Sequence, residues 1–175
     1  MGESLLHFLG SGQAGRWLVV HGHIHIPNLM YAQGGMASAT VLSAGSFSAH
    51  LYPELQGFAR NQFYELDIGV NPDGLLVGKG RAWDWTPGKG WTKATRESGL
   101  PYSFGFGARL DPLVLAKRIE SRIENYMTWS DVIEMEPDIE YMLPGDIALL
   151  VIELERLHIN VLEEGDNFVQ LGRAQ

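Results

Sequence analysis

Short runs in which apolar and polar residues alternate fill the first part of the chain. The clearest run lies between Leu18 and Pro27, where alternation would place apolar side chains on one face of a strand and histidines on the other. The same period predicts strands at residues 40–43, 60–68 and 75–82, with a turn at Asn71-Pro72-Asp73-Gly74. We also expect a short helix at 3–9, a loop at 28–39 and a tryptophan-rich hairpin at 83–91.

Helical spacing replaces this alternation after Asp111. An Asp-Pro pair is typical of a helix start, because aspartate accepts hydrogen bonds from free backbone N–H groups and proline has none to lose. A capping-box pattern from Thr128 to Asp131 predicts a second helix, and a third, with an apolar stripe, opens at Gly145-Asp146. A terminal hairpin is predicted around the turn at 163–167. Three helices and a hairpin make a small winged-helix-like module.

The change of period divides the chain into three segments. We predict an α+β protein with a mainly antiparallel sheet part at 1–97, a linker at 98–109 and a helical module with a terminal hairpin at 110–175. A chain of 175 residues is long enough for such parts to bury a core. The tryptophans of the hairpin are expected to pack across strands rather than form a stacking platform.

Charge is distributed unequally between the two main parts. Residues 1–109 contain eight Lys and Arg against seven Asp and Glu, whereas residues 110–175 contain five against fourteen. Contacts to nucleic-acid phosphates require positive charge, so we expect the acidic module to bind a protein or another copy of the chain rather than nucleic acid. The chain has no cysteine and no long apolar run, which predicts a cytoplasmic protein without disulfides or membrane contact.

Three of the six histidines, His21, His23 and His25, occur at two-residue spacing at the end of the first predicted strand. Same-face residues of a strand are roughly 6–7 Å apart, close enough for imidazoles to ligate one metal ion or two adjacent ions. An exposed strand end without a ligand would give the same spacing. The concentration of histidines just before an expected loop favours a metal site.

This stretch resembles a motif of the calcineurin-like metallophosphoesterases. The resemblance rests on Gly22-His23-Ile24-His25 and on the later strand and turn Val41-Leu42-Ser43-Ala44-Gly45-Ser46, within roughly residues 3–82. It implies the C-terminal half of a metallophosphoesterase-type β-sandwich, with His23 and His25 as ligands of a dinuclear manganese, iron or zinc centre and His21 behind the ligands or near the substrate. The implied reaction is metal-dependent hydrolysis of phosphate esters.

The other ligand motifs of that family do not occur in this sequence. They are Asp-x-His, Gly-Asp-x-x-Asp and Gly-Asn-His followed by an acidic residue, and no segment matches them. Two histidines cannot hold two metal ions when each ion needs at least three protein ligands. The resemblance therefore implies a fragment that is inactive alone, exposes an apolar face or strand edge, and needs an N-terminal half or another copy of the chain.

Two other interpretations are compatible with the sequence. In the first, the chain is a non-catalytic protein-binding or assembly module, in which the acidic C-terminal part is functional and the histidine strand is vestigial. In the second, His23 and His25 hold one zinc ion together with His21 or His50. This single-metal site would lack an acid–base partner for hydrolysis.

Overall fold

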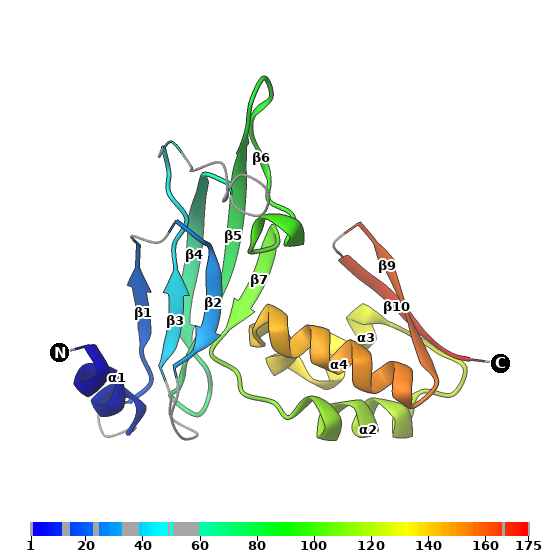
Figure 1. Ribbon diagram of the computed structural model, residues 1–175. Coiled ribbons are helices and arrows are strands. Elements are labelled where there is room, and N and C mark those ends of the chain that lie inside the picture. Colours follow the sequence, from blue (N-terminus) through cyan, green and yellow to red (C-terminus); the bar gives the residue numbers. More distant parts are fainter. Residues whose placement is uncertain are drawn as a thin grey trace.

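The structure is a computed structural model that describes residues 2–11, 15–22, 25–32, 39–48, 50, 60–165 and 167–174. Two parts lie side by side (Figure 1): helix α1 (Gly2–Gly10) with two β-sheets, and a group of helices with a β-hairpin. The α+β class predicted from the sequence is confirmed. No helix in the described part of the chain is both long enough and apolar enough to cross a membrane.

The first sheet contains β1 (Leu18–His21), β2 (Asn28–Tyr31) and β3 (Thr40–Ser43) in the order β1-β3-β2. Strand β1 is parallel to β3, whereas β2 is antiparallel to it. Strand β1 ends at His21, as predicted for a strand at residues 16–21, although the alternation that was expected as far as Pro27 forms no strand at residues 25–27. The loop expected at 28–39 was wrong for residues 28–31, which form β2 because they pair with the free side of β3.

The second sheet contains β4 (Gln62–Val70), β5 (Leu76–Thr86), β6 (Gly90–Lys93) and β7 (Ser103–Phe106), all antiparallel to their neighbours. Strand β5 includes both the strand expected at 75–82 and the first arm of the tryptophan hairpin. The tryptophans pack across strands as expected: Trp83 stacks on Phe63 at a centroid distance of 4.6 Å, and Trp85 meets the edge of Trp91 at 5.4 Å.

The two sheets share a core in which residues of both are buried together. Leu29 and Leu42 come from the first sheet, and Phe104 and Phe106 come from β7 of the second. The two phenylalanine rings occupy the space above the glycines opposite them on β5, Gly80 and Gly78, where a Cβ atom would collide with them. These glycines therefore bring β7 close to β5.

The segment expected as a linker, residues 98–109, contains β7 and follows the short 3-10 helix η1 (Arg96–Ser98). This segment is thus part of the second sheet rather than a free connection. The division of the chain at 1–97 and 110–175 stays a prediction. The backbone N–H of Ala108 donates to the carbonyl of Tyr141 at 2.9 Å, which joins the end of this segment to the helical part.

The C-terminal part has the element order of a winged helix. It runs through α2 (Pro112–Arg122), β8 (Tyr126–Thr128), α3 (Trp129–Met135), η2 (Pro137–Tyr141), α4 (Pro144–Arg156), β9 (Ile159–Glu164) and β10 (Asn167–Arg173). Its antiparallel sheet has the order β8-β10-β9. Asp111 caps α2 as predicted, and Thr128 and Asp131 form the predicted capping box of α3. Leu115, Ile119, Leu150 and Leu154 are fully buried where α2 and α4 pack together.

Candidate functional site

The histidine stretch is only partly within the described residues. His21 is exposed at the end of β1, and its Nδ1 atom lies 3.1 Å from the carbonyl of Gly22. His25 is half-buried and has a φ of +58°, so the strand alternation does not continue from His21 to His25. His23 lies outside the described residues. Its assignment and that of His25 as metal ligands therefore stay predictions.

The described part of the chain contains no group of three or more histidine, aspartate or glutamate side chains that could hold a metal ion. His7 lies exposed on α1, and His50 is also exposed. The predicted metal centre therefore has no geometric support in these segments. Another candidate site is the space between the winged-helix part and the second sheet.

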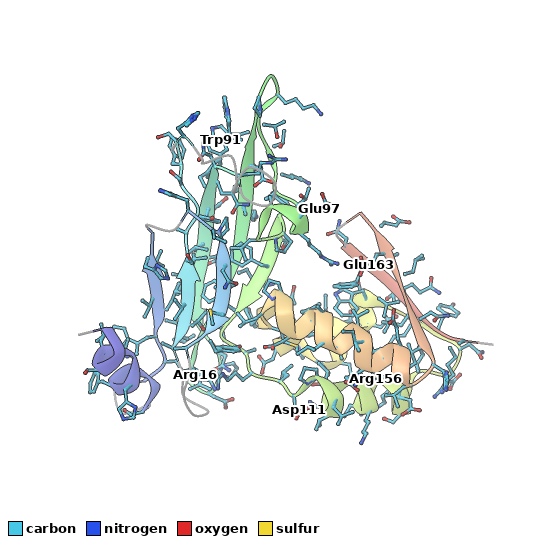
Figure 2. All side chains as sticks on the ribbon, in the orientation of Figure 1. Arg16, Trp91, Glu97, Asp111, Arg156 and Glu163 are labelled. Atoms are coloured by element: carbon cyan, nitrogen blue, oxygen red, sulfur yellow. The ribbon has the colours of Figure 1, made fainter. Side chains whose placement is uncertain are left out.

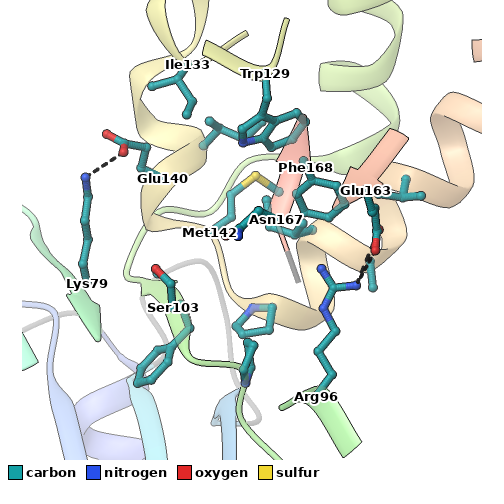
Figure 3. Close-up of a pocket in the computed structure, with 18 of the residues that line it drawn as sticks. Lys79, Arg96, Ser103, Trp129, Ile133, Glu140, Met142, Glu163, Asn167 and Phe168 are labelled. Atoms are coloured by element: carbon teal, nitrogen blue, oxygen red, sulfur yellow. Dashed lines mark hydrogen bonds and ion pairs between the residues drawn. The ribbon is translucent and has the colours of Figure 1, made fainter. Parts of the chain in front are cut away.

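A cleft of about 600 Å³ lies between the second sheet and the winged-helix part. Its apolar wall comes from the winged helix (Figure 3), where Trp129 and Phe168 contact each other at a ring-centroid distance of 4.8 Å. Met142 and Ile133 extend this wall. The opposite side is formed by β7 and η1 with the connection between them. A cavity of this size and lining is typical of a binding site.

Two ion pairs connect the parts on either side of the cleft (Figure 3). The Nζ atom of Lys79 on β5 lies 2.8 Å from a carboxylate oxygen of Glu140 in η2, and Arg96 of η1 lies 3.3 Å from Glu163 of β9. Figure 2 shows η1 and the hairpin facing each other at the labelled Glu97 and Glu163. Each pair is partly exposed, so it contributes orientation more than stability.

Glu155 of α4 also lines the cleft and is exposed. Within the described residues it takes part in no salt bridge, since the five ion pairs use other carboxylates. The charged residues of the lining are thus two cations that already have partners and three glutamates. An uncompensated negative charge remains at the rim.

The exposed face of α4 is unusually apolar for a helix of an acidic module. Leu149 and Ile152 are 51% and 43% exposed, and Ala148 lies exposed beside them. Ile152 and Ala148 border the cleft, which makes its apolar wall continuous with this face of the helix. Contiguous exposed apolar surface on a folded protein commonly marks a contact site.

The start of α4 is held by a partly buried polar cluster. Burial raises the pKa of Asp146 above its usual value of 3.8, and the nearby charge of Arg109 opposes this shift. The Arg109 guanidinium lies 3.9 Å from the ring centroid of Tyr31 on β2. The Tyr31 hydroxyl donates to the carbonyl of Ala108 at 2.8 Å, and burial raises its pKa to about 12. The charges of Arg109 and Asp146 thus lie near each other where the first turn of α4 approaches the first sheet.

The described lining of the cleft combines an apolar wall with charged groups at the rim. The lining residues in the described part of the chain include no histidine, and Glu140 and Glu163 are held in ion pairs. An apolar wall with a few charged groups at its rim recognises a partner by shape and charge. Sequence reasoning missed this site because its residues are spread from Lys79 to Phe168 and are assembled only by the docking of the two parts.

A family model named wHTH-Calcineurin_assc matches residues 104–164. The match begins in β7 and ends in β9, so it covers most of the winged-helix part, and the winged-helix-like module predicted from the sequence is confirmed. No curated protein matches the chain. No solved structure matches it either.

The proposed resemblance of residues 3–82 to calcineurin-like metallophosphoesterases was wrong. The matched model describes an associated winged-helix domain, and no match to a catalytic family accompanies it. The hydrolase and phosphatase interpretation, with its phosphate-ester substrate, is withdrawn for the same reason, and the described residues show no metal centre. The two stacked sheets are therefore described without assigning them to the metallophosphoesterase sandwich.

Proposed function

We propose that this chain is a non-catalytic association module that binds another protein through its winged-helix part. The observation that carries this proposal is the exposed apolar face of α4, where Leu149 and Ile152 lie beside an apolar cleft. Depletion of charge and enrichment of apolar side chains at the centre of a patch are typical of protein interfaces. The matched domain, described as associated, supports the same interpretation.

Binding of DNA is disfavoured by the charges of the same helix. In a DNA-binding helix-turn-helix protein, the recognition helix enters the major groove and its surroundings supply cations to the phosphates. Helix α4 carries Asp146, Glu153 and Glu155. Its arginine, Arg156, forms an ion pair with Glu153. Such a helix would be repelled by a phosphate backbone.

The name of the matched family suggests which partner to test first. It describes a winged helix-turn-helix domain associated with calcineurin. We propose a calcineurin-type phosphatase domain of the same organism as the protein partner, with this chain contributing contacts rather than catalytic groups.

The test measures complex formation between the full chain and that phosphatase domain by light scattering and titration calorimetry. We expect Ile152→Asp to weaken the complex at least about tenfold, because it places a charge in an apolar contact. The matched control is Val70→Asp, since Val70 is 72% exposed at the end of β4, away from the cleft. Equal effects of the two substitutions, or salt-dependent binding to duplex DNA without binding to the phosphatase domain, would overturn the proposal.

A further inference from the structure

The face of the second sheet that points away from the shared core carries a cluster of aromatic rings. Phe63 lies opposite Trp83 in the register of β4 and β5. Trp91 of β6 likewise lies opposite Trp85 of β5, and residues directly opposite each other share a face. These rings contact one another at centroid distances of 4.6–5.4 Å, and Phe47 stacks on Trp91 at 5.1 Å. We call these five residues the aromatic face.

Part of the aromatic face is open to solvent. Phe47 is 62% exposed and Trp85 is 44% exposed, whereas the other three residues are partly buried. The packing of the rings across the strands fixes their orientation, so a flat ligand can stack on the exposed rings without first ordering them. Contiguous exposed apolar surface commonly marks a contact site. The aromatic face is therefore a second candidate surface, separate from α4.

Basic residues accompany the aromatic residues along the β5–β6 hairpin. Residues 79–96 contain five Lys and Arg and one acidic residue, although the whole chain has 13 basic and 21 acidic residues. The acidic residue, Asp84, is buried on the opposite face of β5, where Ser98 and Gln62 donate hydrogen bonds to it. The charges that this hairpin itself presents to solvent are therefore positive.

Two of these cations are available to a ligand. Lys89 and Lys93 form no salt bridge within the described residues. Lys93 lies opposite Trp83, and its Nζ atom is 4.4 Å from the ring centroid of Tyr102, so its charge stands on the aromatic face. Lys89 is exposed in the turn, two residues before Trp91. Both lysines thus lie beside the aromatic rings.

Neighbouring carboxylates do not cancel these charges. Glu65 of β4 is already paired with Arg81, and the acidic winged-helix part docks at the other end of β5, where Lys79 meets Glu140. Six residues of strand, roughly 20 Å, separate Lys79 from the Trp85 position. Charges are largely screened beyond about 8 Å at physiological salt. Figure 1 shows the β5–β6 turn at the end of the sheet away from α2 and α4, and Figure 2 places Trp91 there.

We infer that the aromatic face binds single-stranded nucleic acid. Bases would stack on the exposed rings of Phe47 and Trp85, and phosphates would contact Lys89 and Lys93. Every base has a flat π-face, so aromatic rings bind unpaired bases with little sequence preference. The bases of a duplex are stacked on one another, which leaves only phosphates for two lysines to contact. The inference goes beyond association through α4 and uses a different surface.

The first test titrates the full chain into fluorescein-labelled oligothymidylate and oligouridylate of about twelve nucleotides and follows the anisotropy. We expect both to bind, and Trp85→Ala to weaken binding at least about fivefold because a stacking ring is lost. Phe47→Ala, at the more exposed ring, should have the same effect with less change to the fold, which circular dichroism checks.

The matched control is Tyr126→Ala, which removes a ring that is 67% exposed on β8, outside the aromatic face. Its affinity for the oligonucleotides should equal that of the parent chain. Equal effects of the three substitutions would overturn the stacking assignment. Absence of oligonucleotide binding by the parent chain at low salt would overturn the whole inference.

The second test examines the phosphate contacts through salt dependence. For single strands the logarithm of the binding constant falls with the logarithm of the salt concentration by about 0.7 per phosphate contact. We therefore expect the double variant Lys89→Gln, Lys93→Gln to reduce this slope by about 1.4. Lys117→Gln, at an exposed residue of α2, is the control and should keep the parent slope. A slope that the double substitution leaves unchanged would overturn the lysine assignment.

Other ligands are separated by three further probes. We expect duplex DNA of the same length to bind at least about tenfold more weakly than the single strand. Polyglutamate that binds as tightly as the oligonucleotides would indicate a site for any polyanion and overturn the inference. Binding to phosphatidylserine–phosphatidylcholine vesicles without binding to oligonucleotides would identify a membrane-contact hairpin and also overturn it.

The two proposed surfaces can fail independently. Trp85→Ala should leave the complex with the phosphatase domain unchanged, and Ile152→Asp should leave oligonucleotide binding unchanged, because Ile152 lies on α4. Loss of oligonucleotide binding in Ile152→Asp would place the nucleic-acid contacts on the winged helix and overturn the inference.

Discussion

Arg96 and Glu163 are 67 residues apart in the sequence, and their side chains meet at 3.3 Å across the mouth of the cleft. Arg96 also lies over the ring of Phe168, 5.2 Å from its centroid. One side chain of η1 therefore contacts two positions of the β9–β10 hairpin. This contact and the Lys79–Glu140 ion pair connect the two sides of the cleft.

The Arg96–Glu163 pair is expected to couple the two parts weakly. The coupling is measured by urea unfolding in a double-mutant cycle with Arg96→Ala and Glu163→Gln, and we expect a coupling energy of about 0.5 kcal/mol. This energy should fall in high salt, because both side chains are partly exposed. The control cycle uses Arg81 and Glu65, a pair within the second sheet. A coupling energy that is unaffected by salt would contradict this account.

Ser98 donates a hydrogen bond to the buried carboxylate of Asp84, so loss of the Ser98 hydroxyl should lower the stability of the protein. Its hydroxyl donates to Asp84 at 2.5 Å, and the Gln62 amide donates to the same carboxylate group at 2.6 Å, all three residues being buried. Ser98→Ala leaves Asp84 one donor short, so we expect a loss of about 1–3 kcal/mol in the free energy of unfolding. Ser130→Ala, at an exposed residue of α3, should change it by less than about 0.5 kcal/mol.

Gly105 sets the distance between β7 and η2. A Cβ atom at this residue would overlap the backbone of Glu140, whereas a Cβ atom at Gly69 would lie in open space. We expect Gly105→Ala to lower the free energy of unfolding by about 1–3 kcal/mol, because the two parts must move apart. Gly69→Ala should have little effect in the same urea titration. Equal stability of the two variants would show that η2 docks less tightly than described.

The capping box of α3 gives the protein an acid-sensitive contribution to stability. The hydroxyl and backbone N–H groups of Thr128 donate to the Asp131 carboxylate and hold its pKa below 3.8. The stabilisation is therefore complete above the usual pKa and is lost as the pH falls through the lowered one. We expect Asp131→Asn to be less stable than the parent at pH 7 and to approach it in acid. A difference that is constant with pH would contradict this linkage.

The histidine stretch is expected to bind metal weakly. In a calorimetric titration of the full chain with zinc, we expect at most one ion per chain and a loss of affinity for His23→Ala or His25→Ala. His7→Ala, at an exposed residue of α1, is the control and should leave binding unchanged. We also expect no hydrolysis of bis(p-nitrophenyl) phosphate above background. Tight binding of two ions would show that further ligands come from elsewhere in the chain.

The sequence predicted those features that depend on the residues of a single helix or strand. Asp111 and the pair Thr128–Asp131 start their helices because the capping side chains satisfy backbone groups only two or three residues away. The helical period that includes α4 likewise predicted a winged-helix-like module, whereas the avoidance of nucleic acid inferred from the acidity of residues 110–175 stays a prediction. The short motif Gly22-His23-Ile24-His25 suggested a hydrolase wrongly, because such a motif indicates a metal site only when the other ligands are also present.

Tertiary structure alone decided how the two parts meet. Residues 28–31 form β2 because β3 offers a free side, and residues 103–106 form β7 because Gly78 and Gly80 leave room for two phenylalanine rings. The cleft exists because η2 docks on β7 and because Lys79 and Arg96 reach glutamates far along the chain. No periodicity encodes such contacts, since their free energy comes from surfaces that are brought together only in the folded protein.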